Sequence, residues 1–176
     1  MTCPDPLKMY HAWRYAIWTG DLLEWASDTA LGHVIRWFTG YDVNHTSMII
    51  RFRNFDQARV YNLEALKPGV YPNLLSRRLK NFRGRVYWLQ LKPEFDVYRA
   101  AIAREGLKYV GLKYDYRSLL KQAVSRVSAQ ADAFFCSELC YLANQDAGLP
   151  MTDQTYAPQP GEFARLGVYK SKLQIF

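Results

Sequence analysis

His45-Thr-Ser-Met-Ile-Ile-Arg-Phe52 and Arg59-Val-Tyr-Asn-Leu-Glu-Ala-Leu66 are the two stretches that decide the fold class. Both are rich in β-branched, aromatic and aliphatic residues, and the second alternates between apolar and polar positions. The polar segment Arg53 to Ala58 lies between them. Two strands joined by a short polar loop predict an antiparallel hairpin.

Further elements are predicted after this hairpin. Arg85 to Leu91 has the composition of a third strand, which Pro93 ends. Helices are predicted over residues 97–109, 119–127 and 134–147. Since no internal repeat or low-complexity linker interrupts the chain, we expect one α+β domain over residues 1–176, with 1–18 as an N-terminal arm.

One helix is predicted before the hairpin. Its apolar residues have the i, i+3, i+4, i+7 spacing of a single helix face: Leu31, Val34, Ile35 and Phe38. Gly40 is placed to end it. We therefore expect this face to be buried.

The composition is that of an ordinary globular protein, with 49% apolar and 22% charged residues. Three cysteines, Cys3, Cys136 and Cys140, cannot all pair within the chain, which favours reduced thiols. The first residues lack the layout of a signal peptide, and no stretch has the apolar length of a membrane span. We therefore expect a cytoplasmic protein, unless another route exports it.

The net charge of +7 favours anionic partners. The basic residues are densest over segment 77–85. This segment is interpreted either as a solvated basic face or as a contact with an anionic surface or membrane. Charge alone gives little support to nucleic-acid binding, because no reading motif accompanies it.

Cys136 lies at the start of the last predicted helix. In a first turn, free backbone N–H groups and the helix dipole would stabilise a thiolate and could receive an oxyanion. The alternative is a small buried thiol without a chemical role.

A thiolate nucleophile needs a base, and the base needs a group that orients it. His45 begins a predicted strand, so its ring could project from the end of the sheet. Glu64 is the acid in an apolar part of the next strand, where it is either a surface charge or the group that orients His45. Adjacent paired strands could bring these two side chains within reach.

Other chemistries lack their motifs. The sequence has no Cys-x-x-Cys pair, no His-Glu-x-x-His motif, no phosphate loop and no Gly-rich dinucleotide turn. We therefore expect no metal ion and no nucleotide or other cofactor.

Short motifs follow one another in a recognisable order: Gly20-Asp21, Asn44 to Ile50, Asn62 to Ala65, Gly111 to Asp115, and Phe135 to Leu139. Together they resemble the circularly permuted branch of the NlpC-type papain-like superfamily, and more narrowly the YiiX-like proteins. The likeness runs from about Thr19 to Gly167.

The resemblance implies a permuted papain-like fold: a small, barrel-like antiparallel sheet packed against helices, with the nucleophile at the N-terminus of a C-terminal helix. It implies that Cys136 is the nucleophile, His45 the general base and Glu64 the orienting residue. Tyr114 would line the cleft near the thiol, its alternative being a buried ring with a bonded hydroxyl.

Three functions are compatible with these residues. The first is a thiol hydrolase that cleaves an amide bond, in a peptide or a cell-wall stem peptide, through a thioester. The second is a lipid acyl hydrolase or acyltransferase like the lecithin:retinol acyltransferase relatives. The third is a non-catalytic module on the same scaffold that binds a membrane or a polymer.

Overall fold

The computed structural model describes residues 6–54, 57–66, 69–112, 130–152 and 157–176. Its strands are β1 Leu22–Ser27, β2 His45–Asn54, β3 Gln57–Leu66, β4 Gly69–Leu74, β5 Gly84–Leu89 and β6 Leu173–Gln174. They form a six-stranded antiparallel sheet in the order β4-β3-β2-β1-β5-β6. The sheet is open, so the expected barrel-like closure is wrong.

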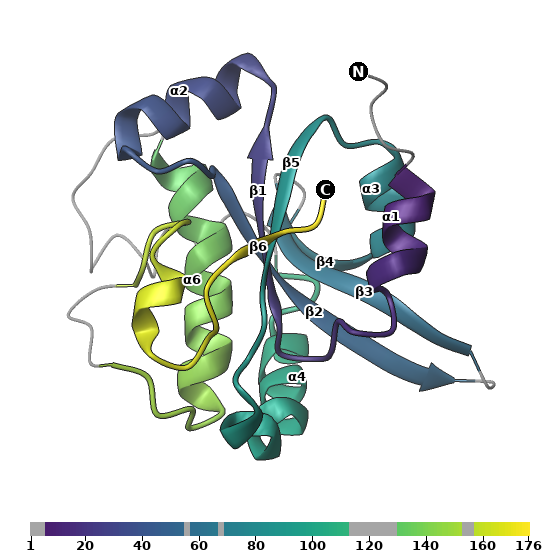
Figure 1. The fold of residues 1–176 in the computed structure, drawn as a ribbon. Helices are drawn as coiled ribbons and strands as arrows, with labels where there is room; N and C mark the ends of the chain where they lie inside the picture. The colour runs from purple at the N-terminus through teal and green to yellow at the C-terminus, as the bar shows by residue number, and fades with distance from the viewer. Residues whose placement is uncertain (1–5, 55–56, 67–68, 113–129, 153–156) are drawn as a thin grey trace.

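Helices cover both faces of this sheet (Figure 1). The α-helices of the described residues are α1 Pro6–Trp13, α2 Ala30–Thr39, α3 Leu75–Lys80, α4 Arg99–Lys108 and α6 Gln130–Asp146. Two short 3₁₀ helices, η1 Pro93–Tyr98 and η3 Phe163–Leu166, accompany them. The predicted α+β class is therefore confirmed.

The predicted hairpin is formed by β2 and β3. Met48 lies opposite Leu63 in an antiparallel pair, and His45 is the first residue of its strand. The strand predicted from Arg85 is β5. The edge strand β4 was not predicted because it contains Pro72, which a sheet tolerates at its edge.

Alternating side chains along the strands build two cores, one on each face. Leu22, Met48 and Leu63 pack with the α4 and α6 face. Residues one position further along, such as Leu23 and Ile49, pack on the other face against α1 and α3. The helix α1 contributes the buried Tyr10 and the partly buried Trp13 to this second core, so part of the predicted N-terminal arm is packed structure.

The helix α2 lies over one end of the sheet with its apolar side turned outward. Ile35 is buried, but Leu31, Val34 and Phe38 are exposed, so the expectation of a buried apolar face is wrong for these three. The reason is Gly32: a Cβ there would lie 2.2 Å from the Ser27 hydroxyl oxygen and 2.6 Å from its carbonyl oxygen. The glycine side of the helix therefore sits against the end of β1.

The helix that carries Cys136 begins earlier than predicted. It already includes Gln130, six residues before Cys136, whereas the prediction placed Cys136 in the first turn. The Gln-Ala-Asp-Ala sequence from Gln130 contains no helix breaker, so the helix continues through it. The expected placement of Cys136 at a helix N-terminus is wrong, and the backbone N–H groups there belong to the helix interior.

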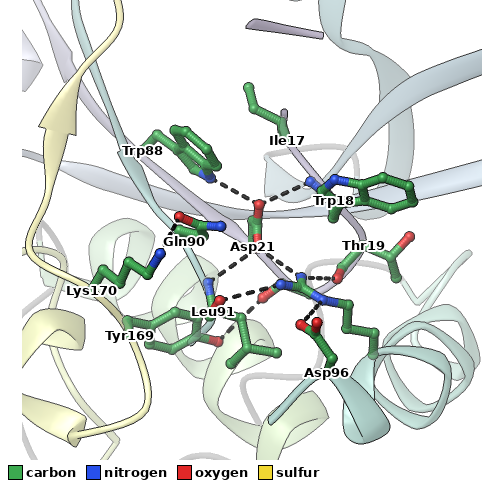
Figure 2. A network of polar contacts seen from close by, with 12 residues as sticks. Ile17, Trp18, Thr19, Asp21, Trp88, Gln90, Leu91, Asp96, Tyr169 and Lys170 are labelled. Carbon is green, nitrogen blue, oxygen red and sulfur yellow. Dashed lines mark hydrogen bonds and ion pairs between the residues drawn. The ribbon is translucent and has the colours of Figure 1, made fainter. Parts of the chain in front are cut away.

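Asp21 joins the start of β1 to three other parts of the chain (Figure 2). Its carboxylate accepts hydrogen bonds from the Trp18 backbone N–H and the Trp88 indole, both at 2.9 Å, and from the Leu91 N–H at 3.1 Å. The Arg99 guanidinium lies 2.7 Å from the same carboxylate. Asp21 is completely buried, and this network gives it the structural role that a Gly-Asp turn favours.

Two predictions lie outside the described residues, namely the helix over 119–127 and the side chain of Tyr114. Within the described residues, no helix is both long and apolar enough to cross a bilayer.

Candidate active site

His45 and Glu64 are brought together by the register of β2 and β3. His45 begins β2, and its Nε2 lies 3.0 Å from Glu64 Oε2. Both side chains project on the same face of the sheet, and both are buried. The structure thus places the predicted base and the predicted orienting residue in direct contact.

Two further residues hold Glu64, and sequence reasoning did not assign them to the site. The Asn73 side-chain amide donates to Glu64 Oε1 at 2.8 Å, and Arg78 Nε lies 3.1 Å from the same oxygen. Asn73 comes from β4 and Arg78 from α3. Arg78 belongs to the basic segment 77–85, which was interpreted either as a solvated face or as a contact with an anionic surface, but it turns inward to a buried carboxylate. No local signal distinguished it from its exposed neighbours.

Cys136 reaches this end of the sheet from α6. Its sulfur accepts a hydrogen bond from the backbone N–H of Thr46 at 3.4 Å, one residue after His45. Neither Cys136 nor Cys140 forms a disulfide in the described structure. Cys136 has no exposed surface.

The electrostatics of the site favour a charged pair between histidine and carboxylate. Burial by itself lowers the pKa of His45, but the adjacent Cys136 sulfur and the Glu64 carboxylate raise it to about 9. Burial by itself raises the pKa of Glu64, but the hydrogen bond and charge of His45, together with Arg78, lower it to about 2. At neutral pH the imidazole is therefore protonated and Glu64 is ionised.

A cavity of about 240 Å³ opens beside His45. Its walls are mostly apolar and come from β1, α2, β3 and the segment after α3, including Trp25, Leu31, Ile35, Ala65 and Phe82. Such a cavity is suited to an apolar group of a ligand, with His45 at its edge.

Glu24 is a further buried carboxyl near the site, and sequence reasoning missed it. It lies opposite Thr46 in the β1–β2 pair and has no exposed surface. The Gly161 N–H donates to one carboxyl oxygen at 2.8 Å. The other oxygen and the Thr46 hydroxyl have no hydrogen-bond partner among the described residues. An acid inside a strand that is otherwise apolar was the available signal.

Comparison with known proteins was informative at the level of the fold. The fold resembles that of YiiX. The solved structure, described as metalloprotein YiiX from Escherichia coli O157:H7, matches with a TM-score of 0.56 and 21% identity, over 77% of this chain and 70% of that chain. No family model and no curated protein matches the chain. The likeness to YiiX establishes the fold alone, and the wider placement among NlpC-type proteins stays a prediction.

The word metalloprotein in that description refers to YiiX and not to this chain. Within the part of the chain that the structure describes, no three histidine, cysteine, aspartate or glutamate side chains are placed to hold a metal ion together. His45, Glu64 and Cys136 therefore do not fit a metal centre in the arrangement described here.

Proposed function

We propose that the chain is a thiol hydrolase that cleaves an amide bond, with Cys136 as nucleophile, His45 as general base and Glu64 as the orienting residue. The observation that carries the proposal is the position of His45, whose Nε2 is bound to buried Glu64 at 3.0 Å while its pKa is raised by the Cys136 sulfur. A thiol is activated when it contacts a base and that base is in turn held by an orienting group.

In this mechanism the proton of the Cys136 thiol has already passed to His45, and the thiolate attacks the carbonyl carbon to form a tetrahedral intermediate. The C–N bond then breaks as His45 gives its proton to the leaving amine, which leaves a thioester. His45 next takes a proton from water, whose oxygen attacks the thioester, and the thiolate is released beside the protonated imidazole. Glu64, held by Asn73 and Arg78, keeps the imidazole ring in place throughout.

Cys140 provides a matched control for the reactivity of Cys136. It lies one turn later on α6, is equally buried, and its pKa is raised well above the ordinary value because burial disfavours the thiolate. We expect iodoacetamide near neutral pH to modify Cys136 faster than Cys140, as followed by peptide mass spectrometry. His45→Ala and Glu64→Gln should slow the modification of Cys136 and leave that of Cys140 unchanged. Equal rates at both thiols in the wild type would falsify the activated thiol.

The lipid acyl hydrolase or acyltransferase is a second candidate, favoured by the apolar lining of the cavity beside His45. An acyl chain is the kind of group that such walls accept. Wild type and Cys136→Ala should be incubated separately with cell-wall stem peptides and with phospholipid vesicles, and the products identified by mass spectrometry. Turnover of lipid alone, dependent on Cys136, would replace the amide-bond substrate with an ester.

A further inference from the structure

The outer side of α2 is apolar, which is unusual for a helix at the surface of a sheet. The exposed fractions of Leu31, Val34, Trp37 and Phe38 are 49%, 53%, 84% and 61%. At about 100° per residue, these four side chains fall within an arc of roughly 120° on the helix. Of the buried residues of α2, Gly32 lies on the opposite side, and Ile35 lies between Gly32 and Leu31, about 40° from Leu31. We refer to the four exposed residues as the α2 apolar face.

The orientation of α2 is fixed by specific contacts. Gly32 allows the close approach to Ser27, and the Arg36 guanidinium donates to the Ser27 carbonyl at 2.5 Å. Thr29 caps the helix by accepting from the Gly32 N–H at 3.1 Å. The side of α2 that carries Gly32 and Arg36 thus faces the sheet, and the α2 apolar face is held outward.

Positive charge lies at the same end of the sheet. Ser27, the last residue of β1, pairs with Gly84, the first residue of β5, so the segment before β5 lies beside the start of α2 (Figure 1). Arg83 and Arg85 flank Gly84 and are exposed. The residues of α2 include no acid, and Asp28 is the one acid in the connection from β1. Two exposed arginines therefore lie on the strand segment that pairs with the end of β1, close in the fold to the start of α2.

We propose that the α2 apolar face, with Arg83 and Arg85, is a docking surface for a bilayer that contains anionic phospholipid. Apolar side chains on one side of a helix, together with nearby cations, are the features that bind the interface of such a bilayer. The net charge of +7 favours an anionic bilayer over a second copy of the chain, since two copies repel each other. The apolar side chains enter the interface while the arginines contact the headgroups.

Docking in this way has a consequence for the candidate site, and this consequence rests on the proposed function. Leu31 belongs both to the α2 apolar face and to the lining of the cavity beside His45. Asn44, next to His45, accepts from the Ser27 N–H at 2.8 Å and so ties the site to the start of α2. A bilayer bound at α2 would bring amide or ester bonds of membrane-borne substrates next to Cys136 and His45.

Vesicle co-sedimentation tests the docking surface. The full chain should bind vesicles of equal parts phosphatidylcholine and phosphatidylglycerol, and bind pure phosphatidylcholine more weakly. Trp37→Ser with Phe38→Ser should lower the partition coefficient by about tenfold or more, because two large apolar side chains no longer enter the interface. Arg83→Gln with Arg85→Gln should lower it by about tenfold on the anionic vesicles only.

The matched controls are exposed residues of η1 and α4, outside the proposed docking surface. Val97 is 79% exposed in η1, and the Arg104 side chain is 69% exposed in α4, so Val97→Ser and Arg104→Gln should leave binding unchanged. Absence of binding by the wild type, or equal losses in the control variants, would overturn the proposal. So would a dimer in sedimentation equilibrium that Trp37→Ser dissociates. Cys136→Ala should bind normally, so an inactive thiol and a failed docking surface give separate results.

Discussion

At the scale of single residues, His45 connects the parts of the candidate site. Its Nε2 faces Glu64, which leaves Nδ1 for the thiol. Because its pKa is raised from 6.5 to about 9, the stabilisation from its charged form is fully present below pH 6.5 and is lost as the pH rises through 9. Near neutral pH the folded state therefore gains from the protonated imidazole.

Glu24 has the opposite effect on stability at neutral pH. Burial raises its pKa from 4.5 to about 7, despite the hydrogen bond from Gly161. Between these values the folded chain keeps a proton that the unfolded chain releases, so stability falls as the pH rises. Across this window we expect wild type to lose about 3 kcal/mol of unfolding free energy relative to Glu24→Gln. Urea unfolding at a series of pH values measures the difference.

The control for Glu24 is Glu94→Gln, which removes an acid from an exposed position of η1. Because the position is exposed, the unfolding free energy of this variant should lie within about 0.5 kcal/mol of the wild type. A constant offset between Glu24→Gln and wild type, without a slope between pH 4.5 and 7, would mean that the Glu24 carboxyl does not titrate as described.

At the scale of secondary structure elements, period and composition predicted the hairpin, β5 and the helical region of α6. These signals are local. The closeness of His45 and Glu64 could also be predicted, because it follows from the pairing of the two strands of the hairpin. Asn73 and Arg78 could not be found this way, because their contacts with Glu64 depend on where β4 and α3 pack. The periodicity of α2 gave its apolar stripe but could not give the side that faces the sheet. That side was decided by Gly32.

The packing of α2 against the end of β1 can therefore be tested at Gly32. Alanine favours a helix more than glycine does, so Gly32→Ala would stabilise an isolated helix. In the folded chain its Cβ would lie 2.6 Å from the backbone carbonyl oxygen of Ser27, which cannot move without shifting β1. We expect Gly32→Ala to lower the unfolding free energy by about 1–3 kcal/mol, as measured by urea unfolding.

Gly106→Ala in α4 is the comparison. A Cβ there would lie 3.1 Å from the end of the Leu63 side chain, which would have to shift by only a few tenths of an ångström, so the loss should be smaller. If Gly32→Ala proved as stable as the wild type, α2 would not be held against Ser27 as described.

At the scale of the whole molecule, the buried Asp21 carboxylate links segments that lie far apart in the sequence. The carboxylate receives hydrogen bonds from the segment before β1, from β5 and from the residues after it, and Arg99 reaches it from the start of α4. Arg99 also donates to the Thr19 carbonyl at 2.6 Å. Neither candidate catalytic chemistry nor the cavity involves these residues, so their contribution is to hold the sheet and α4 in one arrangement.

A double-mutant cycle between Asp21 and Arg99 measures this contribution. Removing one partner takes away a buried charge-assisted contact, while the N–H groups around Asp21 and the Asp96 carboxylate beside Arg99 remain. Asp21→Asn or Arg99→Met alone should therefore cost about 1–3 kcal/mol of unfolding free energy. The double variant should cost less than the sum of the two, with a coupling energy of about 1–3 kcal/mol in urea unfolding. The Lys172–Asp42 pair, which is partly exposed on both sides, should give a coupling of about 1 kcal/mol or less. Additive losses at Asp21 and Arg99 would show instead that the two side chains stabilise the chain through separate contacts.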